Sequence, residues 1–123
     1  MLKTAITVAV AFMVLVSGPV LAAEKEITIG EYLKIYDEGS PALKEKLENS
    51  TATSGRTIFV VNEYLKLVGQ PPLFCPPKEG LNNSDYFAAF QITARLPDSV
   101  ELPAIGRTAI LLTGLIYNFP CKK

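Results

Sequence analysis

The sequence predicts an all-α fold, a small four-helix domain with one disulfide that is preceded by a cleaved signal peptide. In four segments, apolar residues recur every three or four positions, which is the period of a helix with one buried face. Capping residues, prolines and glycines mark the ends of these segments. No segment alternates strictly between apolar and polar residues, as a half-buried strand does. Helices packed against one another are therefore the expected architecture.

Residues 1–22 are predicted to be a secretory signal peptide. Lys3 gives a basic start, residues 5–16 are almost entirely apolar, and Ser17-Gly18-Pro19 interrupts the run shortly before Ala22. We expect cleavage after Ala22, with Ala23 as the next candidate position. An uncleaved anchor is disfavoured, because a bilayer span needs roughly 20 apolar residues. The mature domain, residues 23–123, is then expected in the periplasm, with no membrane insertion after cleavage.

Cys75 and Cys121 are the only cysteines in the chain and are predicted to form one disulfide. An exported protein folds in an oxidising compartment, where such bridges persist. A catalytic redox pair is disfavoured, because it usually has its two thiols close together in the sequence. A metal site is also disfavoured, since two cysteines without any histidine fall short of four tetrahedral ligands.

The first helix is predicted over residues 29–38. Thr28 and Glu31 have the spacing of a capping box, in which each side chain satisfies a free backbone donor at the helix start. Gly39 is a suitable helix stop. Ser40 as the cap and Pro41 at the first helical position then begin a second segment.

The second helix is predicted over residues 41–68. Its apolar face continues to Gly69, but residues 49–55 are poor in helix formers. We favour one long helix with a kink near Gly55 over two separate helices. The local alternative is a strand over residues 57–61, which contain several β-branched side chains.

Four prolines make residues 70–80 an irregular connector. The third helix is predicted over residues 84–96, with Asn82 or Asn83 as its cap and Pro97 as its end. A turn is expected over residues 98–102. Pro103 then opens the fourth helix, which reaches about Asn118.

Composition favours a binding protein over an enzyme. Lys plus Arg number 12 and Asp plus Glu number 12, without a run of one sign, which argues against a dedicated nucleic-acid binder. Histidine is absent, so the usual general base at neutral pH is missing. No nucleophile elbow or phosphate-binding loop occurs, and no cofactor is expected.

The order of several short motifs resembles the Rap/Tai family of type VI secretion immunity proteins. These motifs are Tyr64 to Gly69, Phe74-Cys75-Pro76-Pro77, a capped helix closing at Pro97, Leu102-Pro103-Ala104 and Phe119-Pro120-Cys121. The resemblance covers residues 41–121. It implies a small helical bundle with a disulfide, located in the periplasm. It also implies a protein partner, a peptidoglycan amidase toxin whose active-site cleft the chain would block.

The predicted contact surface comprises the connector and the following turn, because loops on a rigid scaffold often carry binding groups. Its residues are Gln70, Leu73, Lys78, Glu79, Asp98 and Glu101. The alternative is an ordinary connector around a structural disulfide. Two other functions stay open, a periplasmic chaperone or stress protein and an envelope-assembly subunit. A second copy of the chain, forming a homodimer, is a further candidate partner.

Overall fold

The computed structural model describes residues 26–122, and the predicted signal peptide lies outside these residues. The described part contains five α-helices and one short 3₁₀ helix, and it has no strand beyond an isolated bridge between Thr28 and Pro103. The elements are α2 (Ile29–Glu38), α3 (Pro41–Leu67), α4 (Asn83–Ala94), α5 (Pro97–Val100), η1 (Ala104–Gly106) and α6 (Arg107–Asn118). The predicted all-α class is confirmed.

The helix starts follow the capping signals of the sequence. The Thr28 hydroxyl accepts from the backbone N–H of Glu31, and the Glu31 carboxylate accepts from that of Thr28, at 3.1 and 3.0 Å. The Ser40 hydroxyl accepts from the backbone N–H of Leu43 at 3.2 Å. The N-cap of α4 is Asn82 and not Asn83, and it forms a second capping box with Asp85. These caps satisfy donors that a helix start leaves free.

Helix α3 is continuous through its polar middle, so the alternative of a strand over residues 57–61 is wrong. The hydroxyls of Thr51, Thr53 and Thr57 each donate to the backbone carbonyl four residues earlier. Each hydroxyl thus has a partner within the helix itself, so the polar side chains of this segment are satisfied without a break in the helical conformation.

The segment after α4 differs from the prediction. Helix α4 already ends at Ala94, two residues before the predicted end at Leu96. Pro97 occupies the first position of the next helix, so the expected turn over residues 98–102 begins inside the single-turn helix α5. Pro103 precedes the 3₁₀ turn η1, and α6 starts only at Arg107. The prediction of four helices is therefore one short helix too few, and the last helix begins later than expected.

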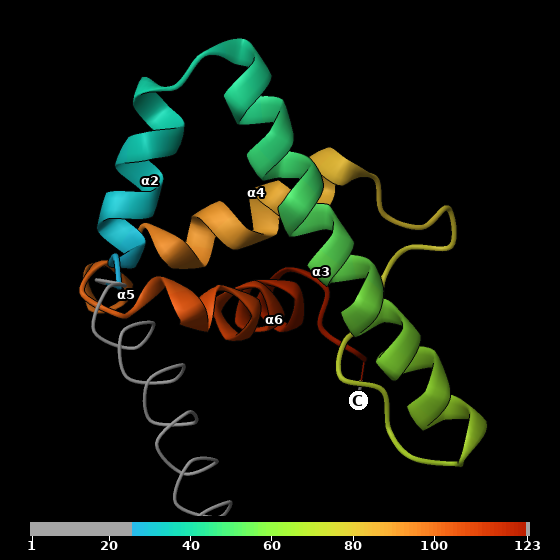
Figure 1. The fold of residues 1–123 in the computed structure, drawn as a ribbon. Helices are drawn as coiled ribbons and strands as arrows, with labels where there is room; N and C mark the ends of the chain where they lie inside the picture. The colour runs from blue at the N-terminus through green and yellow to red at the C-terminus, as the bar shows by residue number, and fades with distance from the viewer. Residues whose placement is uncertain (1–25, 123) are drawn as a thin grey trace, which may run out of the picture.

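Helix α4 is the centre of the core. Figure 1 shows α4 and α6 side by side, with α3 crossing them. α4 contributes buried residues on almost all sides, among them Tyr86, Phe87 and Phe90. Two glycines allow close crossings: a Cβ on Gly55 would lie 2.2 Å from the Tyr86 ring, and one on Gly114 would lie 2.1 Å from the carbonyl oxygen of Ala89.

Two polar pairs attach α2 to the other helices. The Arg95 guanidinium donates to both carboxylate oxygens of Asp37, at 2.8 and 3.1 Å, and this contact holds the pKa of Asp37 below its usual value. The Tyr36 hydroxyl donates to the Glu48 carboxylate at 2.6 Å, and this hydrogen bond is the main reason that the pKa of Tyr36 is raised to about 12. The first pair joins α2 to the end of α4, 58 residues away in the sequence, and the second joins α2 to the next helix, α3.

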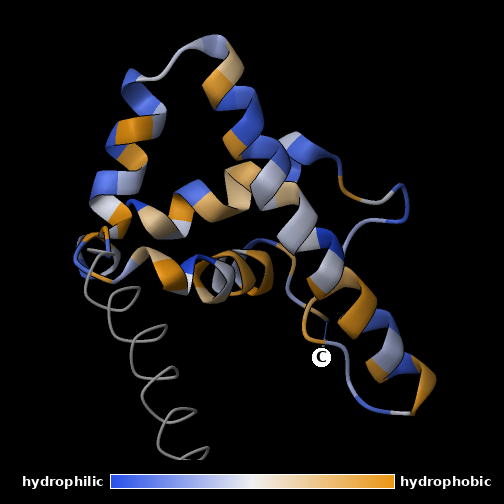
Figure 2. Ribbon diagram, viewed as in Figure 1, coloured by the Kyte–Doolittle hydropathy of each residue, from blue (hydrophilic) through white to orange (hydrophobic). Residues whose placement is uncertain are grey.

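The last turns of α3 extend past α4 and α6 (Figure 1), and the connector between α3 and α4 returns along them. Colouring by hydropathy shows apolar residues gathered at this projecting end (Figure 2). Within residues 26–122, no helix combines the length and the apolar character that crossing a membrane requires.

Candidate protein-binding site

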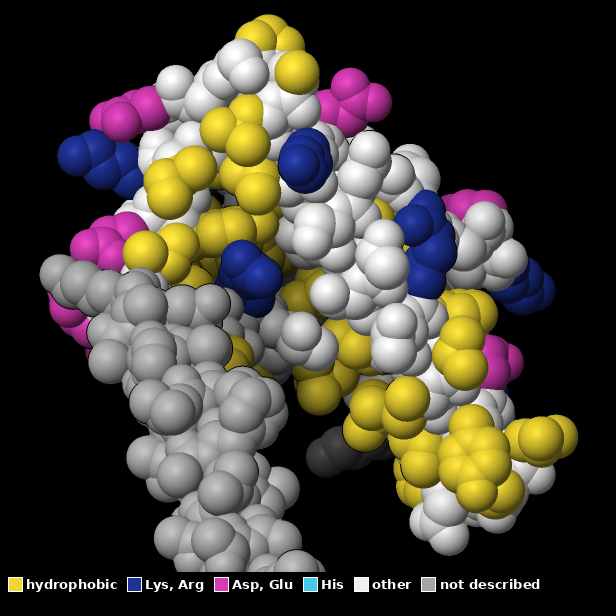
Figure 3. All heavy atoms as spheres, viewed as in Figure 1, with side chains coloured by type: hydrophobic (Ala, Val, Ile, Leu, Met, Phe, Trp, Pro, Cys, Tyr) yellow, Lys and Arg dark blue, Asp and Glu magenta, His cyan; other side chains and the backbone are white. Residues whose placement is uncertain are grey.

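The projecting end of α3 carries a stripe of exposed apolar side chains, here called the apolar tip. It consists of Val60, Val61, Tyr64, Leu67 and Val68. Tyr64 is 60% exposed and Leu67 is 83% exposed. The spacing of three or four residues places these side chains on one face of the helix. Figure 3 shows apolar side chains gathered at the lower right of the molecule, where this end of α3 lies.

The apolar tip is exposed because no other helix in the described part reaches it. On the opposite side of α3, Ile58 is buried and Phe59 packs against the core. A stripe with helical spacing normally faces a core. A contiguous apolar patch on a soluble protein typically marks an interaction site. The second apolar face of α3 is therefore the best candidate for a contact surface.

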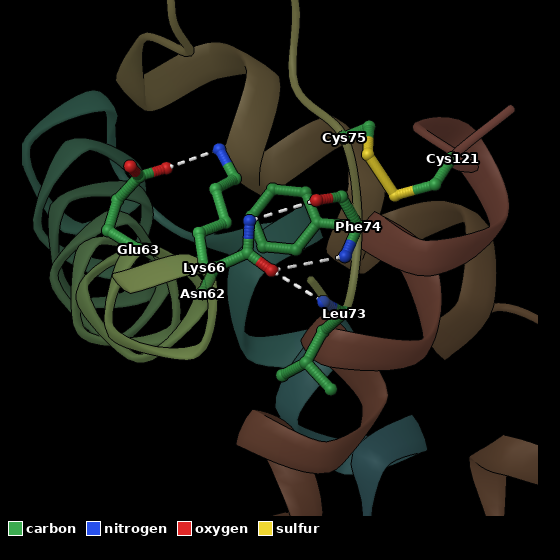
Figure 4. The surroundings of a disulfide bond; sticks show 7 residues. All are labelled: Asn62, Glu63, Lys66, Leu73, Phe74, Cys75 and Cys121. Atoms are coloured by element: carbon green, nitrogen blue, oxygen red, sulfur yellow. Dashed lines mark hydrogen bonds and ion pairs between the residues drawn. A yellow bond between two sulfur atoms is a disulfide. The ribbon is translucent and has the colours of Figure 1, made fainter. Parts of the chain in front are cut away.

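Asn62 fixes the connector against the base of the tip (Figure 4). This side chain is fully buried. Its amide nitrogen donates to the carbonyl of Phe74 at 2.9 Å, and its amide oxygen accepts from the backbone N–H groups of Leu73 and Phe74 at 2.6 and 3.2 Å. The Asn62 amide thus both donates to and accepts from the connector backbone, as a neighbouring strand does. This pairing fixes the path of the connector along α3.

The predicted disulfide between Cys75 and Cys121 is confirmed, with a Cα–Cα distance of 4.9 Å. It follows directly after Phe74 and joins the connector to the segment that leaves α6 (Figure 4). The backbone N–H of Cys75 also donates to the carbonyl of Phe119 at 2.8 Å. The connector is therefore held from two sides, by Asn62 and by the bridge.

A compact turn closes the end of α3. Gly69 has φ +77°, the left-handed conformation that favours glycine after a helix. The backbone N–H of Gly69 donates to the carbonyl of Lys66 at 3.1 Å, and that of Gln70 donates to the carbonyl of Leu65 at 2.8 Å. These bonds satisfy carbonyls that a helix end leaves free, so the apolar tip ends in a well-defined turn.

The rim of the tip is charged but compensated. Lys66 and Glu63 form an ion pair at 2.7 Å, and both side chains are close to half exposed. Such an exposed pair contributes little to stability, because water screens it and two long side chains lose freedom. An apolar centre with a polar rim is the usual anatomy of a protein–protein interface.

The structure divides the predicted contact surface into two parts. Gln70 and Leu73 lie on the connector beside the apolar tip, and Lys78 and Glu79 are exposed further along it. Asp98 lies in α5 and Glu101 follows directly, at the other end of the molecule from the tip (Figure 1). A single partner would have to span the whole domain to contact both the connector residues and the pair Asp98 and Glu101.

The apolar tip and Asn62 are the features that the sequence analysis missed. The sequence predicts one apolar face that continues to Gly69, and its periodicity does not separate the buried part of this face from the exposed part. A signal was present, because eight of the eleven residues in the segment IFVVNEYLKLV, residues 58–68, are apolar. A helix with a single buried face contains fewer apolar residues than this. The lone Asn62 in this segment was the second signal.

In the described range, no three Cys, Asp or Glu side chains lie close enough together to hold a metal ion. Searches among protein families, curated proteins and solved structures give no match to this chain. The Rap/Tai resemblance therefore stays a prediction that depends on the motifs alone.

Proposed function

We propose that the chain is a secreted, non-enzymatic binding protein that inhibits a partner enzyme by inserting the apolar tip into its cleft. The observation that carries this proposal is the projection of the tip beyond the helical bundle. The tip is convex, apolar and held by Asn62 and the disulfide. Enzyme active sites are concave and lined mostly by apolar groups, so a fixed convex element complements their shape.

Rigidity favours this role. A preorganised element loses little conformational freedom on binding, which leaves more of the contact energy for affinity. Tyr64 and Leu67 are also suitable contact residues. Both are large and exposed, so burying them in a pocket removes apolar surface from water, which favours binding. The connector beside the tip supplies Gln70 and Leu73 as further contacts.

The resemblance to the Rap/Tai family supplies the class of partner. We propose a periplasmic immunity protein, and its target is a peptidoglycan amidase delivered by a neighbouring cell. The absence of histidine in the sequence agrees with a role in binding rather than acid–base catalysis.

The test begins with capture of envelope proteins by the oxidised mature chain, residues 23–123, followed by an activity assay. A cell-wall hydrolase must be recovered, and its release of peptidoglycan fragments must stop at an equimolar dose. Leu67→Lys is expected to weaken inhibition at least about tenfold, the effect of losing about 1.4 kcal/mol of binding energy.

Ile35→Lys is the matched control for this test. Ile35 is an apolar side chain, 45% exposed, on α2, which lies away from the apolar tip (Figure 1). Inhibition equal to that of the unmodified chain is expected. Equal inhibition by the Leu67→Lys variant would exclude the tip. Recovery of a constitutive envelope subunit, or of many unfolded clients, would instead favour one of the two alternative functions.

A further inference from the structure

A second exposed surface lies at the other end of the molecule from the apolar tip. The end of α4, α5, η1 and the start of α6 form an open groove of about 450 Å³. Its apolar walls include Leu96, Leu102 and Ile105, which are 51%, 46% and 85% exposed. Thr93, Ser99 and Thr113 add hydroxyl groups, and no charged side chain lines the groove. Apolar side chains on several elements thus face one open channel.

A polar recess adjoins this groove, and Ile105 lines both. The recess has a volume of about 60 Å³, and its polar lining includes Ser50, Ser54, Arg107 and Thr108. Arg107 is the only charged group in it. One water molecule needs roughly 10–15 Å³ of such volume. The recess is several times larger than that, so it has room for a carboxylate group.

Arg107 is held in place without a carboxylate partner. Its guanidinium lies 4.7 Å from the centre of the Tyr32 ring, in a cation–π contact. The two ion pairs of the described residues involve Lys66 and Arg95, so Arg107 has no anionic partner there. Guanidinium groups bind carboxylates through paired hydrogen bonds, and the neighbouring hydroxyls are additional donors.

We propose that this groove binds an apolar peptide segment of a partner protein, with an Asp or Glu side chain of that segment paired to Arg107. The groove and the recess meet at Ile105, so a segment that crosses Ile105 places apolar side chains in the uncharged groove and one negative charge in the recess beside Arg107. A fatty acid fits less well, because sites for small apolar ligands bury most of the ligand surface and this groove is open. A second copy inserting its apolar tip would form a head-to-tail contact, which tends to grow into open chains.

Peptide display on the oxidised mature chain tests this proposal. A random-peptide library is selected on the unmodified protein and depleted on an Ile105→Ser variant, which removes peptides that bind elsewhere, including at the apolar tip. The remaining peptides are expected to combine apolar residues with one Asp or Glu at a fixed spacing. Their affinity for Ile105→Ser is expected to be at least tenfold weaker.

A charge reversal supplies the decisive comparison. Selection on Arg107→Glu is expected to replace the acidic residue of the peptides by Lys or Arg. Ile35→Lys is the control and is expected to bind the original peptides unchanged. Three results would overturn the proposal: no peptide remains after depletion, the selected peptides show no charge preference, or Arg107→Glu binds them equally well. Self-association that Ile105→Ser abolishes, or decanoate binding that requires Arg107, would assign another occupant.

Discussion

Replacing Asn62 by alanine is expected to destabilise the fold by about 3 kcal/mol. The side chain makes three hydrogen bonds, at 2.6, 2.9 and 3.2 Å, to the backbone of Leu73 and Phe74. A typical hydrogen bond contributes about 1 kcal/mol, and a buried partner left without one costs about 1–3 kcal/mol. Asn62 and Phe74 are fully buried, so water does not readily replace the lost bonds.

Urea unfolding of the oxidised chain, followed by circular dichroism, measures this change in the free energy of unfolding. Asn118→Ala is the matched control, because the Asn118 amide makes one hydrogen bond, to the carbonyl of Gly114 at 2.7 Å, within its own helix. We expect a loss of about 1 kcal/mol or less for this variant. A loss below about 1 kcal/mol for Asn62→Ala would refute the reasoning, because the clamp would then contribute no more than a single helical hydrogen bond.

Three further predictions concern stability. Reduction of the disulfide is expected to lower the free energy of unfolding by about 4 kcal/mol, because the bridge closes a loop with a sequence separation of 46. An unchanged urea midpoint would contradict this. Gly114→Ala is expected to cost about 1–3 kcal/mol, since the added Cβ meets the carbonyl oxygen of Ala89, whereas Gly106→Ala, which has open space, is expected to cost nothing. The raised pKa of Tyr36, about 12 against 10.0, means that the folded state holds this proton more tightly, so its contribution is complete below pH 10.0 and is lost as the pH rises towards 12. Tyr36→Phe is therefore expected to show a shallower alkaline decline in urea stability than the unmodified chain, and an identical decline would count against the Glu48 hydrogen bond as its cause.

The helices were predictable because their signals are local. Thr28 and Ser40 mark two helix starts, and Asn82 or Asn83 marks a third; the observed N-caps are Thr28, Ser40 and Asn82. A cap depends on residues within one turn, so the sequence alone contains the information. The disulfide was predictable for a different reason, because only two cysteines exist and one pairing is available. The last helix was harder to place, since Pro97 and Pro103 are compatible both with a loop and with short helical turns.

The apolar tip was not predictable from periodicity. Helical spacing identifies an apolar face but does not state whether another element covers it. For Tyr64 and Leu67 the answer depends on where α4 and α6 end in space, which is a tertiary property. The role of Asn62 is also tertiary, because its partners, Leu73 and Phe74, follow a turn whose path the sequence does not specify. Both features lie at the proposed binding site, where local rules are least informative.

The position of the disulfide connects the proposed function to the predicted export. Cys75 directly follows Phe74, the residue that Asn62 holds, so the bridge and the buried amide restrain adjacent points of the connector. Before oxidation the connector is held at the base of the tip by hydrogen bonds alone, those of the Asn62 amide and the one from the backbone N–H of Cys75 to the carbonyl of Phe119. The bridge forms in an oxidising compartment, which is where the proposed target acts. The apolar tip would therefore reach its rigid form, and its full affinity, only after export.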